Sequence, residues 1–280
     1  MLQIVFAMKE KIIVSFTSYG KRTNNIPSVL DTIFAQTITP DLVVINLAHD
    51  EIISADITNY LKSHNVEINR VPDTKVYKKL LPTLKRYHSD VVINIDDDFL
   101  YPEDMIADFL AVHKRHPNNP ISGNREVFFR MQCHCGCASL TKAEFFGDYL
   151  YQIDDTVIDN CPSDDMVYTF FATKSGHPYL QTEKEYFLNM PEYNADESRG
   201  YSDTVKGDLA VVNSYNYLVK RYGKVENNIA AYTHDDDIAK VISNIQDKTI
   251  WDVESKIRSS HAYRIGKFLL KPLSWIKRSK

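Results

Sequence analysis

VVINIDDDFLYPEDM, residues 91–105, is the stretch that decides the fold. Five apolar or neutral β-formers run directly into three adjacent carboxylates, Asp96, Asp97 and Asp98. Like charges this close raise one another's pKa values unless a cation lies among them. The acids are therefore expected at the crossover from a buried strand to a helix, whose apolar residues recur at helical spacing as Met105, Ile106, Phe109, Leu110 and Val112.

Short β-branched runs alternate with amphipathic segments from residue 11 to about residue 116. A helix is predicted from about Pro27 to Gln36, and another over residues 74–88, which Pro82 is expected to kink or divide. Such alternation is typical of βαβ units, so the predicted fold class is α/β with a mostly parallel sheet flanked by helices. The strand runs are KIIVSF (11–16), LVVINL (42–47), VEINRV (66–71) and DVVINI (90–95).

The pattern loosens after residue 117. EVFFRMQCHCGCASL (126–140) predicts one or two strands, and a helix is expected to begin near Ser163. Residues 191–207 are polar and without periodicity, which predicts a loop that covers a site. Two more helices are predicted, at about 207–221 and 236–258.

The composition bounds the class of protein. A chain of 280 residues with 44% hydrophobic residues is enough for one large or two small domains with a buried core. A net charge of −4 argues against a nucleic-acid-binding surface over the whole molecule. Residues 1–7 lack the marks of a targeting signal, and Met8 is an alternative start.

The four cysteines do not have the spacing of a secreted disulfide framework, so a reducing, cytoplasmic location is expected. Cys133, Cys135 and Cys137 alternate, and on a strand they would share one face while His134 points to the other. Zinc sites more often use C-x-x-C loops, so buried, reduced thiols are favoured over zinc ligands.

Ligands of an open parallel sheet bind beyond the carboxyl ends of its strands. Neither G-x-G-x-x-G nor G-x-x-x-x-G-K-[ST] occurs, so phosphates would have to be held in another way. Carboxylates that hold Mg²⁺ or Mn²⁺ against a diphosphate would do so and would explain the acidic triplet. The alternative is a solvated acidic loop in which Asp98 or a neighbour caps the next helix.

Four segments in order resemble the motifs of bacterial polysaccharide glycosyltransferases with the GT-A fold, close to glycosyltransferase family 2. The resemblance covers residues 11–180. It implies metal-dependent transfer of a sugar, with inversion, from a nucleotide-diphosphate sugar to a hydroxyl of a glycan or lipid-linked acceptor in cell-surface polysaccharide synthesis. The segments are IIVSFTSYGKR (12–22), VYKKLLPTL (76–84), INIDDDFLYPEDM (93–105) and PSDDMVYTFFA (162–172).

The resemblance also implies a division of the chain and of its site. A core of residues 1–180 binds the nucleotide-sugar, residues 181–262 supply the acceptor-side loop and helices of the same domain, and residues 263–280 form a basic tail. Asp96 lies near the ribose, Asp96 and Asp98 hold the metal with Asp97 beside them, and Gly136 lines the donor sugar. The usual proline of the first-strand motif is replaced by Thr17-Ser18.

Further nucleotide-binding candidates come from the ends of strands. Thr17, Ser18 and Tyr19 follow the first strand, with Arg22 as a weaker candidate, and Asp73 follows the third. Lys78 and Lys79 come shortly after, where an ammonium would reach a diphosphate oxygen. One of these two lysines is expected to face solvent, and the alternative is that both belong to an ordinary solvated helix face.

A second acidic pair, Asp164-Asp165, opens the helix near Ser163. Inverting transfer needs a carboxylate that deprotonates the acceptor hydroxyl, and the resemblance implies Asp165 as this base with Asp164 in support. The alternative is N-capping by Ser163, with the acids in the first turn for that reason alone. His234 is a candidate metal ligand by resemblance, although helix capping by Asp235 explains the same letters better.

Residues 264–280 carry six Lys or Arg and no acid, interleaved with apolar residues and Trp275. This combination suits an interfacial anchor on anionic lipid and indicates the inner face of the plasma membrane. The alternative is a terminal segment that packs on the protein or is disordered.

Two other functions of the whole chain stay open: a sugar nucleotidyltransferase, and a catalytically silent glycan-binding protein with the same fold.

Overall fold

The computed structural model describes residues 10–124, 127–129, 131–184, 186, 190, 191, 193 and 205–225. The chain divides into two compact units, of which the first comprises Met1–Glu126 with Met131–Glu226. The second comprises Val127–Arg130 with Asn227–Lys280, and its described part holds the short strand β6 (Val127–Phe128). The predicted helix at 236–258, His234 and the basic tail lie outside the described residues, so the predictions for them remain predictions.

The first unit is built on a seven-stranded sheet with the order β3-β2-β1-β4-β8-β5-β9. The first four strands of the chain are parallel, β8 runs antiparallel between β4 and β5, and β9 pairs parallel with β5. This sheet confirms the predicted α/β class with a mostly parallel centre. Its strands are β1 (Ile12–Thr17), β2 (Leu42–Ala48), β3 (Glu67–Val71), β4 (Val91–Ile95), β5 (Ile121–Ser122), β8 (Ala138–Thr141) and β9 (Leu180–Gln181).

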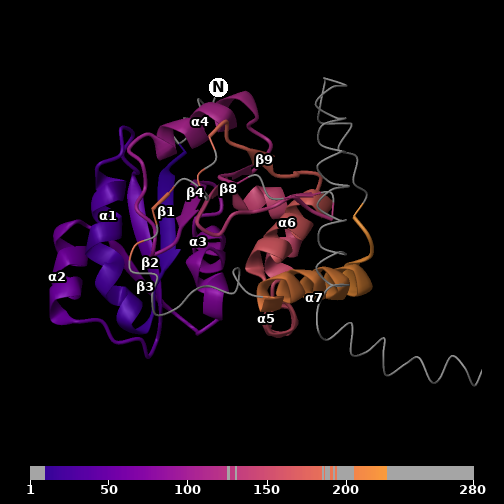
Figure 1. The fold of residues 1–280 in the computed structure, drawn as a ribbon, viewed down its shortest axis with the longest axis horizontal. Coiled ribbons are helices and arrows are strands. Elements are labelled where there is room, and N and C mark those ends of the chain that lie inside the picture. The colour runs from indigo at the N-terminus through magenta and orange to yellow at the C-terminus, as the bar shows by residue number, and fades with distance from the viewer. Residues whose placement is uncertain are drawn as a thin grey trace, which may run out of the picture. The chain divides into compact units, whose positions relative to one another are not determined.

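Helices flank the sheet, and in Figure 1 the group α5, α6 and α7 lies on the opposite side of the strands from α1 and α2. The predicted segment 74–88 is divided before Pro82, because proline fits the first turn of a new helix but not a helix interior. The helices are η1 (Gly20–Asn25), α1 (Ile26–Phe34), α2 (Ala55–Ser63), η2 (Lys75–Lys79), α3 (Leu81–Arg86), α4 (Met105–Arg115), η3 (Ala143–Gln152), α5 (Asp155–Asn160), α6 (Asp164–Lys174) and α7 (Val205–Tyr222).

Helix α4 shows that the acidic triplet does not cap the following helix. The helix begins at Met105, and Asp104 takes the N-cap position. The alternative in which Asp98 or its neighbours cap this helix is therefore wrong. The triplet lies instead in the irregular segment between β4 and α4.

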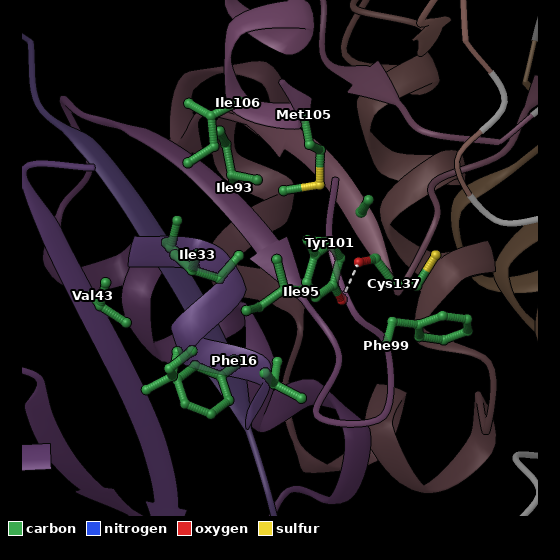
Figure 2. Close-up of a cluster of buried hydrophobic side chains, with 14 of the residues drawn as sticks. Phe16, Ile33, Val43, Ile93, Ile95, Phe99, Tyr101, Met105, Ile106 and Cys137 are labelled. Carbon is green, nitrogen blue, oxygen red and sulfur yellow. Dashed lines mark hydrogen bonds between the residues drawn. The ribbon is translucent and has the colours of Figure 1, made fainter. Parts of the chain in front are cut away.

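One face of the sheet carries an apolar core, seen in Figure 2. Phe16 of β1 and Ile95 of β4 belong to the same buried cluster as Ile33 of α1 and Ile106 of α4. Tyr101 joins this core by its ring and binds the backbone by its hydroxyl. The hydroxyl accepts a hydrogen bond from Asp96 N at 2.8 Å and donates one to the Cys137 carbonyl at 2.8 Å.

The opposite face carries a buried polar layer, because side chains alternate along a strand. Ser15 of β1 donates to the Lys79 carbonyl at 2.6 Å and shares a hydrogen bond of 2.7 Å with the Thr83 hydroxyl. Asn46 of β2 donates to the same hydroxyl at 2.8 Å. These bonds hold η2 and α3 against the sheet and fix the backbone at Lys79.

The prediction that Cys133, Cys135 and Cys137 alternate on a strand is wrong. Strand β7 (Met131–Gln132) ends before the first cysteine, and residues 133–137 form an irregular segment. This segment turns at Gly136, and Ala138 N donates across the turn to the Cys135 carbonyl at 3.2 Å. All three cysteines are reduced and buried, as expected for packed thiols. His134 is also buried.

None of the helices in the described part of the chain is both long enough and apolar enough to cross a membrane.

Candidate functional site

Lys79 is a buried lysine that meets acids from two distant parts of the chain. Its ammonium donates to Asp96 Oδ1 at 2.9 Å and to the Gly136 carbonyl at 3.2 Å, and it lies 3.9 Å from Asp164 Oδ2. Burial alone lowers the pKa of this ammonium, but the charges of Asp96 and Asp164 raise the pKa well above its ordinary value. Lys79 therefore stays charged and joins the end of β4 to the start of α6.

The expectation that one of the two lysines faces solvent is wrong, since both are buried. Lys78 forms an ion pair with Asp73, and the side-chain hydrogen bond to Lys78 lowers the pKa of Asp73. The structure thus brings Lys79 to the acids at the end of β4, while Lys78 is paired with an acid from the end of β3. A buried ammonium needs such a partner, because an uncompensated charge is costly to desolvate.

Arg22 pairs with the other two acids of the triplet. Its guanidinium contacts Asp97 Oδ1 and lies 2.9 Å from Asp98 Oδ2. Asp97 is buried, and burial raises its pKa while the charge of Arg22 and the Ser18 hydroxyl lower it. The triplet is thus divided between two cations, with Asp96 on Lys79 and the other two aspartates on Arg22.

Asp98 is the member of the triplet that best fits a metal ligand. Its Oδ1 atom is buried and has no hydrogen-bond partner in the described part of the chain. Burial and the charge of Asp96 raise the pKa of Asp98 to about 7. An unsatisfied carboxylate oxygen beside a second carboxylate is suited to a hard divalent cation.

A metal at this position would not be enclosed by protein ligands alone. Among the described residues, no group of three or more His, Cys, Asp or Glu side chains is arranged to hold a metal ion. Mg²⁺ commonly binds one or two carboxylates and takes its remaining ligands from phosphate and water. The residues present therefore fit a metal that a phosphate-bearing ligand completes.

The first turn of α6 presents two aspartates in different surroundings. Ser163 caps the helix by accepting a hydrogen bond from Met166 N at 3.3 Å, as the capping alternative predicts. The Asp164 side chain is only 9% exposed, and burial raises its pKa while Lys79 lowers it. The Asp165 side chain is 44% exposed, so Asp165 is the one of the two that a ligand can reach.

Gly136 lies against both Lys79 and Asp165. A Cβ atom added at this position would lie 2.6 Å from Lys79 Nζ and 3.2 Å from Asp165 Oδ1. The Gly136 carbonyl also accepts from Asn94 Nδ2 at 2.6 Å. A side chain at residue 136 would therefore push the ammonium away from its partners.

The residues at the end of β1 differ in their exposure to solvent. Thr17 donates to the Asn46 carbonyl at 2.7 Å, and Ser18 is buried. Tyr19 is exposed, with the Arg22 guanidinium 5.6 Å from its ring centroid. Tyr19 therefore offers an open aromatic surface close to the cation that holds Asp97 and Asp98.

The start of the predicted loop at 191–207 is attached to the acidic segment. Tyr193 N donates to the Asp98 carbonyl at 2.7 Å, and Leu100 N donates to the Pro191 carbonyl at 3.2 Å. The Tyr193 hydroxyl also accepts from Ser28 Oγ at 3.1 Å. These bonds place the first residues of this segment directly beside the acids.

The polar residues beneath this site were not predicted from the sequence. Asn94 and Ser15 are fully buried and hold the backbone at Gly136 and Lys79 respectively. The signal that would have found them is a Ser or Asn at one position of each otherwise apolar strand, in IVSF, VINL and VINI. His134 was also missed: its Nε2 lies 3.9 Å from Asp165 Oδ1.

Many solved structures share this fold, among them two that were determined with nucleotide and metal. The mannosyltransferase of Pyrobaculum calidifontis, in complex with GDP-Man and Mn²⁺, matches with a TM-score of 0.57 and 16% identity, over 91% of this chain and 82% of that one. Glucosyl-3-phosphoglycerate synthase of Mycobacterium tuberculosis, in complex with Mg²⁺ and UDP, matches with a TM-score of 0.50 and 14% identity, over 78% and 81%. No family model and no curated protein matches the sequence. The likeness confirms the predicted GT-A architecture.

The raised pKa of Asp98 predicts a pH-dependent effect of Asp98→Asn on stability. The carboxyl ionises near pH 4 in the unfolded chain and near pH 7 in the folded one, so its contribution to stability falls as pH rises between these values. Asparagine removes this loss. In EDTA, the melting temperature of the variant relative to wild type should therefore rise by roughly 4 °C from pH 5 to pH 8.

Asp148→Asn is the matched control, because Asp148 is exposed on η3. Asp98→Asn should show a larger change between the two pH values than this exposed substitution does. A change no larger than that of the control would show that Asp98 ionises normally in the folded protein.

Proposed function

We propose that the chain is a metal-dependent glycosyltransferase that moves a sugar from a nucleotide-diphosphate sugar to a hydroxyl of a glycan or lipid-linked acceptor, with inversion, in cell-surface polysaccharide synthesis. The observation that carries the proposal is Lys79, which ties Asp96 at the end of β4 to Asp164 at the start of α6. In this proposal a donor site and an acceptor site would meet at Lys79. The likeness in fold to two proteins solved with nucleotide and metal supports this reading.

The metal would be Mn²⁺ or Mg²⁺, held by Asp96 and Asp98, with His234 as a further candidate. When bound, it would neutralise charge on the departing diphosphate. Asp98 Oδ1 supplies an unsatisfied oxygen for it. Asp96 already faces the ammonium of Lys79, which places that cation close to where the diphosphate would lie.

The donor would lie over the ends of β1 and β4. The exposed ring of Tyr19 suits stacking against a base, and Thr17 and Ser18 adjoin it. Gly136 leaves room for the sugar, because even a methyl group there would meet Lys79. Arg22 and Asp97 would orient the acidic segment, since they are already paired with each other.

Asp165 would be the general base. It is exposed while Asp164 is buried, so it is the carboxylate that can contact an acceptor hydroxyl. Its position in the first turn of α6 favours the ionised form through the helix dipole. Asp164 would support it by holding Lys79 in place. The acceptor would enter along residues 191–207, whose start binds the backbone beside Asp98.

A thermal-shift panel of nucleotide diphosphates, their sugars and nucleoside triphosphates, each with and without Mn²⁺, tests the donor site. One nucleotide with Mn²⁺ should raise the melting temperature by roughly 5 °C at saturating concentration, because ligands of the folded state stabilise it. Asp98→Ala should lose the part of this shift that needs Mn²⁺, whereas Asp148→Ala at the exposed control position should keep it. No shift with any member would favour the silent glycan-binding protein, and a shift with nucleoside triphosphates instead would favour the nucleotidyltransferase.

Asp165→Asn tests the base. Asparagine keeps the shape but cannot take the acceptor proton, so transfer should fall by at least ~100-fold while the thermal shift with donor and Mn²⁺ stays at the wild-type value. Asp159→Asn is the control, since that side chain on α5 is 73% exposed. Transfer near the wild-type rate in Asp165→Asn would remove this residue from the role.

The basic tail is proposed to hold the enzyme at the inner face of the plasma membrane, where a lipid-linked acceptor lies. Deletion of residues 264–280 should abolish co-sedimentation with anionic vesicles, because six basic side chains supply the attraction. Neutral vesicles should retain neither form. Binding of the truncated protein to anionic vesicles would place the anchor elsewhere.

A further inference from the structure

His134 is a buried histidine that the proposed chemistry leaves without a role. It is 1% exposed, and its ring packs against Tyr168 and Tyr179, with centroids 5.1 and 5.4 Å away. Burial and the charge of Lys79 lower the pKa of His134 well below its ordinary value. The imidazole is therefore neutral and carries one N–H.

The hydrogen bond between Nδ1 of His134 and the Tyr179 hydroxyl leaves Nε2 able to carry that proton. Nδ1 of His134 lies 3.0 Å from the Tyr179 hydroxyl. Burial raises the pKa of Tyr179 well above its usual value, so the phenol keeps its proton and can donate it to Nδ1. When the phenol donates to Nδ1, the hydrogen of the neutral imidazole is on Nε2, because the hydrogen bond at one ring nitrogen sets which nitrogen is protonated.

Nε2 points toward the proposed base. It lies 3.9 Å from Asp165 Oδ1 and has no hydrogen-bond partner in the described part of the chain. The separation exceeds a hydrogen bond by about 1 Å. Catalytic hydrogen bonds are often long before substrate binds and shorten in the complex.

The backbone of His134 is tied to the same turn of α6. Its N–H donates to Thr169 Oγ1 at 2.8 Å, and that hydroxyl donates to the Asp165 carbonyl at 2.6 Å. Thr169 is fully buried. The position of His134 relative to Asp165 is thus fixed independently of the side-chain contact.

We infer that His134 is a positioning residue for Asp165: its Nε2–H binds the Oδ1 atom and so orients the carboxylate toward the acceptor hydroxyl. Tyr179 holds the imidazole in the tautomer that this requires. The inference rests on the proposed function in that it assigns His134 to the base of that reaction. A neutral donor orients the carboxylate and lowers its basicity less than a cationic donor would, so proton transfer from the acceptor stays feasible.

Two substitutions separate this role from simple packing. His134→Gln places an amide N–H near the position of Nε2, whereas His134→Asn keeps a polar group near Nδ1 but cannot reach Asp165. His134→Asn should lower kcat roughly 10-fold without changing the donor KM, and His134→Gln should restore most of the rate. His116→Gln, at an exposed position after α4, should behave as wild type.

A double-mutant comparison shows whether the effect passes through Asp165. In an Asp165→Asn background, His134→Asn should lower transfer no further, because the group that His134 positions is already lost. Equal losses for His134→Asn and His134→Gln, or a full additional loss in this background, would overturn the inference.

Nitrogen NMR of ¹⁵N-histidine-labelled protein gives a readout that needs no activity. The His134 signals should show a neutral ring with the proton on Nε2, and Asp165→Asn should shift the Nε2 signal. A proton on Nδ1, or a signal that Asp165→Asn leaves unmoved, would overturn the inference. The NMR result tests the contact itself, whereas absent transfer in wild type would instead reject the proposed function.

Discussion

The burial of the Lys79 ammonium is the constraint on which the rest of the site depends. A charged group taken from water must find partners of opposite charge or strong hydrogen-bond acceptors. Lys79 finds them in Asp96, the Gly136 carbonyl and Asp164, which come from the segment after β4, the turn before β8 and the first turn of α6. Because these segments are far apart in the chain, the ammonium can be satisfied only when all of them dock against η2. The folding of this part of the chain and the assembly of the site are therefore one event.

The polar layer under the sheet explains how a lysine is held so deeply. Ser15 binds the Lys79 carbonyl, and Asn94 binds the Gly136 carbonyl that Lys79 also contacts. Replacing either residue with an apolar one would leave a buried carbonyl without this donor, which is the expensive half of losing a hydrogen bond. Tyr101 does the same on the apolar face, where its hydroxyl links Asp96 N to the Cys137 carbonyl. Both faces of the sheet thus converge on the loop at 135–137.

Local patterns predicted the elements well, but not the contacts between them. The crossover after β4, the helix at α1 and the start of α6 follow from apolar periodicity, proline and capping residues within a few positions. The burial of Lys79 does not follow from local patterns, because it depends on carboxylates that lie 17 or more residues away in the chain. The irregular path of Cys133–Cys137 was missed for a similar reason: the letters alternate like a strand, yet the turn at Gly136 is needed to meet Lys79. Ser163 caps α6 whether or not Asp165 acts on a substrate. The letters S-D-D therefore fit both a helix cap and a catalytic base.

The charge balance of the site bears on how a donor would bind. Arg22 and Lys79 are set against Asp96, Asp97, Asp98 and Asp164, yet burial and neighbouring acids still raise the pKa values of Asp98 and Asp164. A nucleotide diphosphate adds further negative charge and so would be repelled by ionised Asp98. A divalent cation alone, in turn, meets too few protein ligands among the described residues to bind tightly. Each of the two would supply what the other needs, so metal and nucleotide are expected to bind together and only weakly apart.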